Sequence, residues 1–486
     1  MLALALVGSV RVDAAEAERP NVLLLCVDDL KPLLGCYGDR TVRTPHMDRL
    51  AMRGLRFDRA YCNQAVCAPS RNALLTGIRP TTSGIYDLGT HFRDVVPDAV
   101  TLPQYFRQHG YRTEALGKVF HVGHGNREDP ASWSVPHFPE RSIAYVTRES
   151  GALEGLTREE ALFANRAARG LPRGAAWEAA DVADDEYPDG RIAAEAVRRL
   201  EAAAGKGKLP FFMAVGFLKP HLPFCAPKRY WDLYVRQRFE LPALRGAPEG
   251  APHHAPSGWG ELRQYRGIPE SGPVDDETAR TLIHGYHASV SYVDAQIGRV
   301  LDALERLDLA SRTLVVLWGD HGWHLGDHGL WSKHDNYEEA ARIPLIVAVP
   351  GVTVPGGRAT RALVETVDLY PTLAELAGLP PPVVPQGMDG RSFAAVLRDP
   401  SRPARDFVTH VFPRGERLGR AIRTPQHRLV EWKLPGASPE TAEIELYDFD
   451  ADPLETRNLA TDQPATVARL RAHLDTLPEA RPQFRR

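Results

Sequence analysis

Four apolar runs place the strongest constraint on what this chain can fold into. Each has six or seven residues and is followed by polar residues, proline or glycine: 21–27, 211–217, 313–318 and 343–349. Such runs are typical of strands that are buried on both faces of a parallel sheet. Between the second and third runs, apolar residues recur every three or four positions from Leu282 to Leu307, which predicts an amphipathic helix. Alternating strands and helices predict a layered α/β domain with a mostly parallel sheet.

A ligand site is expected beyond the carboxyl ends of these strands, because open α/β sheets bind their ligands there. Asp28 and Asp29 follow the first run, and Asp320 and His321 follow the third. Carboxylates at the ends of neighbouring strands converge on one cation, which offsets the repulsion between them. The two pairs together predict a metal site, whereas either pair alone fits an ordinary strand end equally well.

A cysteine precedes a predicted helix in the segment Cys67-Ala-Pro-Ser-Arg71, with the helix expected to start near Ser70. The positive end of that helix and the nearby Arg71 favour an anionic or oxyanion-bearing side chain at position 67. The alternative is a buried and inert thiol, which is common for cysteine. A phosphatase-type loop is excluded, because too few residues separate Cys67 from Arg71 to form that cradle.

Three segments each couple a lysine with a histidine: Lys118 with His121, Lys219 with His221, and Lys333 with His334. Cations gathered around a small tetrahedral anion, with histidines that exchange protons, suit the cleavage of a charged ester. Taken singly, each pair fits a solvated surface better than a site.

Charge and composition exclude several classes of protein. With 59 basic and 62 acidic side chains, the 486-residue chain has no global attraction to nucleic acid, and we expect no such partner. Five cysteines are too few for a disulfide scaffold. No internal segment approaches the ~20 apolar residues of a membrane span, so no membrane partner is expected. The apolar start, followed by small residues, predicts an export signal over residues 1–17.

The rest of the chain divides into a large catalytic part and a smaller C-terminal part. Segments 122–190 and 225–273 resemble insertions and are expected to shape the rim of the site. Near residue 400 the sequence pattern changes. It predicts short strands at 407–412, 428–432 and 445–447, followed by a helix at 464–474. We expect a catalytic domain over residues 18–400 and an α+β subdomain over residues 401–486.

These motifs resemble those of the type I sulfatases. The core Cys67-Ala-Pro-Ser-Arg71 is similar to the signature in which a separate maturation enzyme oxidises the cysteine to formylglycine, also called 3-oxoalanine. Other matching segments follow in family order: 27–30, 44–50, 117–121, 320–322 and 446–453. Segments that look most like the iduronate 2-sulfatase subfamily are 34–39, 64–71, 219–224, 288–292 and 319–323. The resemblance implies an alkaline-phosphatase-like fold, with a large mixed sheet flanked by helices and a smaller C-terminal α+β domain with an antiparallel sheet.

The resemblance also implies a role for each matching residue. As hydrated formylglycine, Cys67 would attack the sulfate sulfur and then expel sulfate with its second hydroxyl, which neither a thiol nor serine carries. One divalent cation, calcium in the family, would be held by Asp28, Asp29, Cys67, Asp320 and His321. Arg71 would stabilise the diolate, and Lys118 and Lys333 would hold sulfate oxygens. His121 would assist the elimination of sulfate, and His221 would protonate the leaving alcohol. Since calcium prefers oxygen ligands, the nitrogen of His321 leaves manganese or zinc open.

The substrate implied by the resemblance is a sulfated uronic acid or another sulfated carbohydrate, as in glycosaminoglycans. Trp323 and His324 are candidate sugar contacts, and four arginines are candidates for acidic neighbours unless they are simply solvated: Arg414, Arg417, Arg420 and Arg423. Three alternatives stay open. They are a phosphonate or phosphate ester hydrolase of the same superfamily, a catalytically silent carbohydrate-binding relative, and an enzyme for a small ester such as choline sulfate. An exported protein would act in the periplasm, outside the cell or in a lysosome-like compartment.

Overall fold

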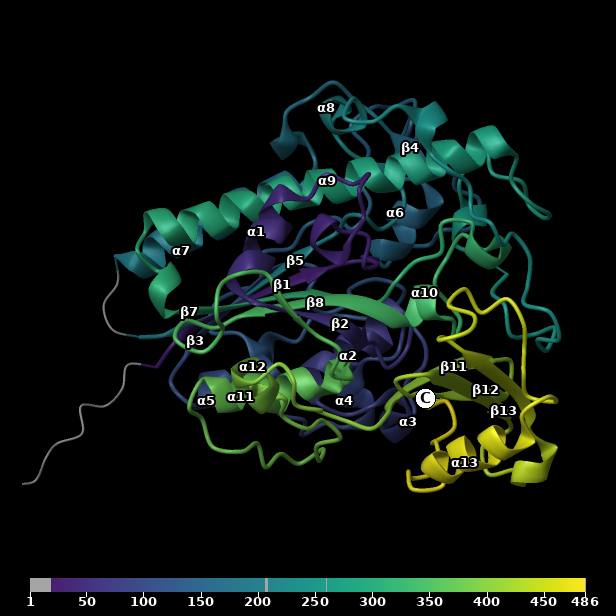
Figure 1. Ribbon diagram of the computed structural model, residues 1–486. Helices are drawn as coiled ribbons and strands as arrows, with labels where there is room; N and C mark the ends of the chain where they lie inside the picture. The colour runs from purple at the N-terminus through teal and green to yellow at the C-terminus, as the bar shows by residue number, and fades with distance from the viewer. Residues whose placement is uncertain (1–18, 206–208, 259, 486) are drawn as a thin grey trace, which may run out of the picture.

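The computed structural model describes residues 19–205, 209–258 and 260–485 (Figure 1). The export signal predicted over residues 1–17 lies outside these ranges. Among the described helices, none combines the length and the apolar character that a membrane crossing requires.

A large mixed sheet forms the centre of the protein. Within the described residues its strands run in the order β10–β2–β8–β7–β1–β5–β3, with β9 beside β2. Their bounds are β1 (Asn21–Val27), β2 (Leu55–Tyr61), β3 (Arg112–Gly117), β5 (Phe211–Phe217), β7 (Thr313–Gly319), β8 (Arg342–Ala348), β9 (Arg358–Thr360) and β10 (Val364–Glu365). Strand β1 pairs in parallel with β5 and β7, and β5 pairs in parallel with β3. All four predicted apolar runs are strands of this sheet.

Strand β8 runs antiparallel to both β7 and β2. The connection from β7 to β8 contains only short helical turns and returns along the same edge, so it cannot make the crossover that parallel strands need. The sheet is thus mostly parallel, as predicted, and β8 is the exception, because an apolar run does not encode strand direction.

Helices cover both faces of the sheet (Figure 1). One layer contains α1 (Pro45–Arg53), α7 (Pro188–Ala204) and α9 (Asp276–Arg306), and the other contains α2 (Cys67–Thr76), α5 (Leu102–Gln108) and α11 (Leu369–Leu376). Because neighbouring residues of a strand point to opposite faces, Leu23 and Leu25 join the core under the first layer, and Val22 and Leu24 join the core under the second. Helix α9 begins earlier than its apolar pattern predicts, since Asp275 caps it by accepting from the Thr278 amide at 2.8 Å.

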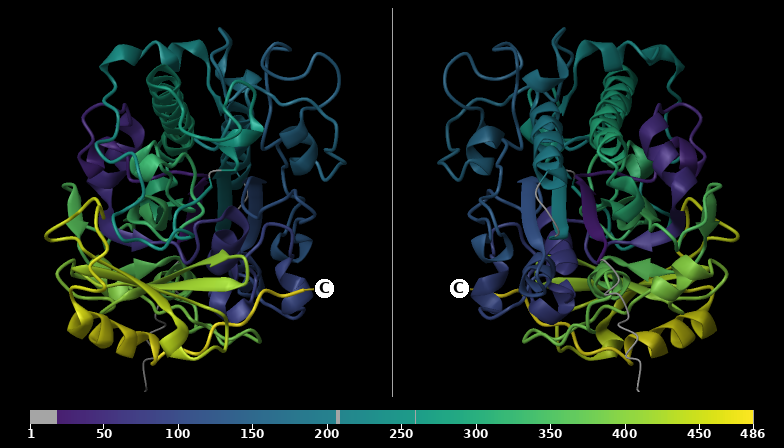
Figure 2. Two further views of the ribbon diagram at one scale, coloured as in Figure 1. Left: turned by 90° about the vertical axis from the view of Figure 1, so that its right-hand side faces the viewer. Right: turned by 90° about the vertical axis from the view of Figure 1, so that its left-hand side faces the viewer.

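The C-terminal part forms a second, antiparallel sheet, which α13 (Pro464–Leu474) covers on one face (Figure 2). Its strands are β11 (Val408–Arg414), β12 (Arg417–Arg423), β13 (His427–Lys433) and β14 (Glu443–Asp448). Strand β12 has no counterpart in the predicted elements. Its arginines give a polar sequence pattern, yet Arg420 and Arg423 are only 7% exposed because they form ion pairs with Glu479 and Glu338.

The two predicted insertions contact each other above one end of the sheet. Strand β4 (Trp177–Glu178) of the first pairs with β6 (Phe224–Cys225) at the start of the second, and the Arg266 amide donates to the Gly174 carbonyl at 2.8 Å. The first insertion also carries α6 (Arg158–Phe163), and the second carries the 3₁₀ helix η5 (Leu262–Gln264). Both elements lie at the rim of the site described next.

Candidate functional site

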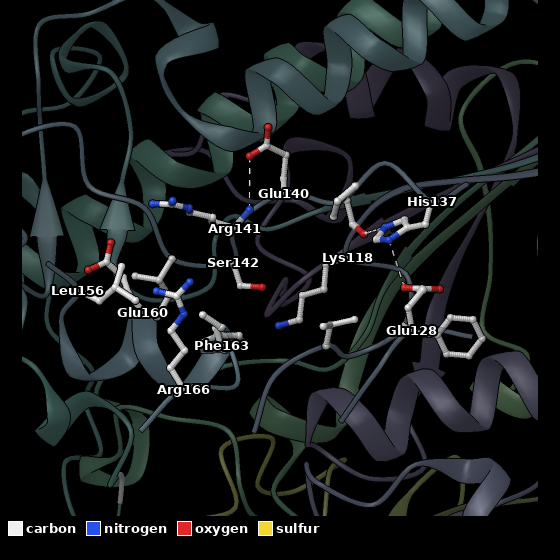
Figure 3. A pocket seen from close by; sticks show the side chains of 16 residues that line it. Lys118, Glu128, His137, Glu140, Arg141, Ser142, Leu156, Glu160, Phe163 and Arg166 are labelled. Carbon is white, nitrogen blue, oxygen red and sulfur yellow. Dashed lines mark hydrogen bonds and ion pairs between the residues drawn. The ribbon is translucent and has the colours of Figure 1, made fainter. Parts of the chain in front are cut away.

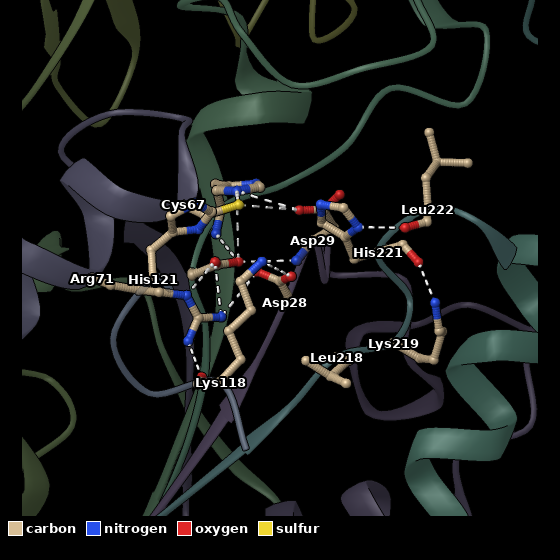
Figure 4. A network of polar contacts seen from close by, with 12 residues as sticks. Asp28, Asp29, Cys67, Arg71, Lys118, His121, Leu218, Lys219, His221 and Leu222 are labelled. Carbon is tan, nitrogen blue, oxygen red and sulfur yellow. Dashed lines mark hydrogen bonds and ion pairs between the residues drawn. The ribbon is translucent and has the colours of Figure 1, made fainter. Parts of the chain in front are cut away.

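The polar residues that follow the strands meet at one edge of the large sheet (Figure 4). Asp28 follows β1, Lys118 follows β3 and Asp320 follows β7, while Cys67 begins helix α2. Since β1 lies between β5 and β7, segments almost 300 residues apart in sequence end side by side. The structure therefore brings the predicted strand-end residues together with Cys67.

Four buried side chains form a candidate metal centre. Asp28, Asp29, Cys67 and His321 each present a ligand atom, and these atoms all lie within 4.8 Å of one another. Asp29 adopts a left-handed backbone conformation with φ of 59°, which turns the chain sharply after β1. Asp320 joins the group by accepting from the Asp29 amide at 2.9 Å.

The electrostatics of this group fit a divalent cation. Burial raises the pKa of Asp29, although the charges of Lys333 and His321 act in the opposite direction. Burial likewise raises the pKa of Asp320 to about 6, against the charges of His321 and Arg71. Burial also opposes ionisation of Asp28, but Lys118 and Arg71 hold its pKa well below the usual range. Clustered carboxylates with one imidazole are a donor set that divalent metals accept, and a bound cation would relieve the repulsion between them.

Cys67 lies at the centre of this cluster. Its Sγ atom is 3.3 Å from Nε2 of His321 and 4.0 Å from Oδ1 of Asp29. Burial, followed by the negative charge of Asp28, raises the pKa of the thiol well above its ordinary value. The helix start and Arg71 therefore do not make the unmodified thiol anionic, and a neutral thiol is a poor nucleophile.

Arg71 is fully buried and holds the carboxylates in place. Its guanidinium group donates to Oδ1 of Asp28 and to Oδ2 of Asp320, each at 3.0 Å. It also donates to the backbone carbonyls of Lys118 and Val119. A planar donor with this many partners has one orientation available, so Arg71 fixes the relative positions of the ends of β1, β3 and β7.

Two buried lysines contact the carboxylates of the cluster. The ammonium group of Lys118 contacts Oδ2 of Asp28, and that of Lys333 lies 2.9 Å from Oδ2 of Asp29. Lys333 also lies 4.9 Å from the centroid of the Trp323 ring, a cation–π contact. Two ammonium groups held this close provide binding for an oxyanion.

The histidines of the site have distinct surroundings. His221 contacts the Leu222 carbonyl through Nδ1 at 2.5 Å, which leaves Nε2 as the atom that faces the cluster. His121 contacts His124 through Nε2 at 3.3 Å, and its buried Nδ1 has no partner among the described residues. Lys219, in contrast, donates to the carbonyls of its own loop and braces it.

Glu261 is a site residue that the sequence did not reveal. It belongs to the second insertion, and its carboxylate lies 3.1 Å from Nε2 of His221 and 2.7 Å from Nζ of Lys333. A single glutamate in a segment rich in proline and glycine carries no distinguishing pattern. The only available signal was the expectation that this insertion shapes the rim.

Two cavities adjoin the cluster. The Cys67 cavity has a volume of about 260 Å³, and its walls include Cys67, Lys333, His121 and residues from both insertions. The Lys118 cavity, of about 720 Å³, is lined by Lys118 and by the first insertion (Figure 3). Phe163 belongs to the walls of both cavities.

The predicted sugar contacts do not reach the two cavities. Trp323 is 1% exposed and His324 is 0% exposed, with the latter paired to Asp335 at 3.1 Å, and neither lines the two cavities. The four arginines of the C-terminal sheet are also occupied, by backbone carbonyls for Arg414 and by glutamates for Arg417, Arg420 and Arg423.

Comparison with known proteins decides the family. A sulfatase family model matches residues 20–379, and a model for the C-terminal region of N-sulphoglucosamine sulphohydrolase matches residues 326–480. The chain belongs to the sulfatase family. It is therefore a sulfuric ester hydrolase, as the cysteine signature predicted.

Among its relatives, this sulfatase is 35% identical to the iduronate 2-sulfatase of Homo sapiens, over 91% of each chain. It is 39% identical to the iduronate 2-sulfatase of Mus musculus, over 74% of this chain and 69% of the mouse protein. The predicted similarity to iduronate 2-sulfatases is thus confirmed.

Solved structures confirm the predicted fold class for this sulfatase. A protein determined in complex with its substrate D-glucosamine-2-N,6-O-disulfate matches with a TM-score of 0.71 and 24% identity, over 94% of this chain and 97% of that chain. The phosphonate monoester hydrolase of Agrobacterium radiobacter matches with a TM-score of 0.74 and 22% identity, over 94% and 95%. At these identities the likeness concerns the fold alone.

Proposed function

We propose that this sulfatase removes sulfate from a sulfated uronic acid or a closely related sugar, with Cys67 converted to formylglycine and one divalent cation, calcium, beside it. The observation that carries the proposal is the convergence of three buried cationic side chains and a carboxylate cluster on Cys67. The identity to iduronate 2-sulfatases, at 35–39%, supports the sugar substrate.

Five residues would hold the cation: Asp28, Asp29, Asp320, His321 and the modified residue at position 67. A bound divalent cation would act as a Lewis acid toward a sulfate oxygen. Formylglycine at position 67 would supply a hydrated aldehyde with two hydroxyl groups, made by a separate maturation enzyme. The raised pKa of the unmodified thiol supports this, since the thiolate that a cysteine nucleophile needs is disfavoured here.

The chain's own cations would bind the ester. Lys118 and Lys333 are 4% and 2% exposed, so their charges act in a site with little water and attract sulfate oxygens strongly. Both are engaged with aspartates in the cluster, which keeps the ammonium groups in place before an ester arrives. Arg71 would stabilise negative charge on the group at position 67.

His221 would protonate the leaving alcohol. Its Nδ1 is engaged by the Leu222 carbonyl, so Nε2 is the atom that can deliver a proton into the site. Burial and the two lysines lower the pKa of His221, whereas Glu261 and the negative charge of a bound ester favour its protonated form. His121, whose Nδ1 is unpartnered among the described residues, would accept a proton during release of sulfate.

Arg158 is the candidate anchor for the carboxylate of a uronic acid. It lines the Cys67 cavity, and its guanidinium group forms no hydrogen bond or ion pair with the described residues. An arginine at the mouth of a cavity pairs well with a planar carboxylate. This feature favours an acidic sugar over choline sulfate as the natural substrate.

Desulfation assays on defined disaccharides test the proposal. We expect turnover of a disaccharide that carries a 2-O-sulfated uronate, with weaker turnover of an aryl sulfate and of a phosphonate monoester. Absence of activity on every 2-O-sulfated uronate would reject the iduronate-type substrate. A clear preference for the phosphonate monoester would instead favour a phosphonate hydrolase of the same superfamily.

We also propose that the chain is exported to the periplasm, the cell exterior or a lysosome-like compartment through residues 1–17, and that residues 18–400 and 401–486 act as catalytic domain and C-terminal subdomain. The separate antiparallel sheet from Val408 to Asp448 supports the second division. N-terminal sequencing of the mature protein, with cleavage expected near residue 17, tests the first.

A further inference from the structure

Two residues that line the Cys67 cavity, Glu159 and Gln264, each have an unused hydrogen-bond acceptor. Oε1 of Glu159 and Oε1 of Gln264 are both shielded from solvent, and neither has a hydrogen-bond partner among the described residues. The Glu159 side chain is only 7% exposed. Because buried polar atoms in folded proteins are nearly always paired, two such acceptors in residues that line one cavity indicate that a ligand completes them.

Local hydrogen bonds position the elements that carry both acceptors. Glu159 lies in the first turn of α6, which Thr157 and Glu160 close with a capping box. Gln264 ends η5, and its Nε2 donates to the Gly260 carbonyl at 3.0 Å, which orients its Oε1 away from that contact. The backbone pairing of the two insertions, through β4 with β6 and Arg266 with Gly174, fixes the relative position of the two elements.

The position of these acceptors suits contact with the alcohol part of the substrate. Cys67 and Lys333 line the same cavity, so an ester whose sulfate meets these two residues places its alcohol part within the remaining walls. Glu261 lies on the same rim, but both His221 and Lys333 already engage its carboxylate. Glu159 and Gln264 are therefore the acceptors left for the alcohol part.

The chemistry of the wall selects for a ligand with hydrogen-bond donors. A sugar ring has hydroxyl groups that donate, whereas an aryl ring or a quaternary ammonium group has no donor to offer. Burial, followed by Glu261, raises the pKa of Glu159 to about 7, so its carboxyl group suits neutral hydroxyl partners. A volume of about 260 Å³ is just below the ~300–1,000 Å³ of typical small-molecule sites, which fits one ring.

We propose that Glu159 and Gln264 bind the hydroxyl groups of the sugar ring that carries the scissile sulfate, and that they determine specificity for a polyhydroxylated alcohol. This inference rests on the proposed sulfated-sugar function. The two insertions then provide the contacts to the ring. Arg158, beside Glu159, lies at the acidic substituent of that ring.

The test compares two substrates in the same variants. Glu159→Leu and Gln264→Leu remove one acceptor each and preserve approximate side-chain volume, and Glu154→Leu on the exposed part of the same insertion is the control. We expect kcat/KM for the sulfated uronate disaccharide to fall about 10- to 100-fold in each cavity variant, the range for a lost hydrogen bond to a charged or buried group. Activity on 4-nitrophenyl sulfate, whose ring has no hydroxyl group to donate, should stay within about twofold, which also shows that the variants fold.

The outcomes separate this inference from the proposed function. Equal losses on both substrates, or full retention of sugar activity in both variants, would overturn the inference while leaving the proposed function intact. Wild-type protein that hydrolyses the aryl sulfate but no sulfated sugar would overturn the proposed function, and the inference with it.

Discussion

Oε2 of Glu261 lies 2.7 Å from Nζ of Lys333, one of the two ammonium groups proposed to bind the sulfate ester. The second oxygen of the same carboxylate contacts His221, the proposed leaving-group acid. A carboxylate in this position imposes a negative charge on the two groups that an anionic ester needs, so ester and Glu261 compete for them.

Glu261→Gln is therefore expected to lower the KM for an aryl sulfate by roughly tenfold. The free energy of a tenfold change is a modest part of the ~4 kcal/mol interaction between unit charges 4 Å apart at a surface-like dielectric. Steady-state kinetics provide the measurement, and the exposed Glu270→Gln on the same insertion is the control. An unchanged or higher KM would show that Glu261 assists binding of the ester.

Arg71 is the residue whose loss should destabilise the site most. Arg71→Met leaves the buried Asp28 and Asp320 without their shared partner, which is expected to cost about 3–5 kcal/mol of unfolding free energy. Urea denaturation compares it with Arg49→Met, which breaks an exposed pair with Asp302 and should cost under about 1 kcal/mol. Similar losses in the two variants would contradict the central structural role of Arg71.

The carboxylate cluster predicts one divalent cation per chain. Elemental analysis of purified protein should find calcium at about one equivalent, and a chelator should lower the thermal midpoint because a bound ligand stabilises the folded state. Asp28→Asn combined with Asp320→Asn should abolish both the metal content and the response to chelator. Protein that is fully active without any divalent metal would refute this site.

Glu159 should make stability depend on pH. Its folded pKa, about 7, lies above the ordinary value of 4.5, so its contribution is complete below about pH 4.5 and is lost as the pH rises through 7. At about 1.36 kcal/mol per pKa unit, the loss is at most roughly 3 kcal/mol. Glu159→Gln should remove this decline, as urea denaturation at pH 5 and pH 8 would show, and an unchanged decline would place its origin in another group.

The sequence predicted the elements of the main sheet closely because burial on both faces leaves a strong local signal. The run at 21–27 is β1, the run at 211–217 is β5, and both deliver polar residues to the carboxyl edge. The direction of β8 could not be predicted in the same way, since it depends on the route of the connecting chain. Strand β12 escaped detection because distant glutamates neutralise its buried arginines.

Part of the site was predicted as well, because some of its residues are placed by local sequence. Asp28, Asp320 and Arg71 follow strands or start a helix, so local sequence places them. Glu159, Gln264 and Glu261 are single residues on insertions, and only the packing of the insertions against each other brings them to Cys67. Trp323 and His324, in contrast, follow β7 closely enough to suggest a substrate contact but are enclosed behind the site.

The proposed conversion of Cys67 to formylglycine can be observed by mass spectrometry of the peptide that contains this residue. The protein should be produced together with a formylglycine-generating enzyme, and its activity should be measured on the same sample. We expect the active protein to carry an aldehyde oxygen in place of the Cys67 sulfur, and we expect Cys67→Ala to abolish turnover. Fully active protein in which Cys67 remains an intact thiol would contradict this proposal.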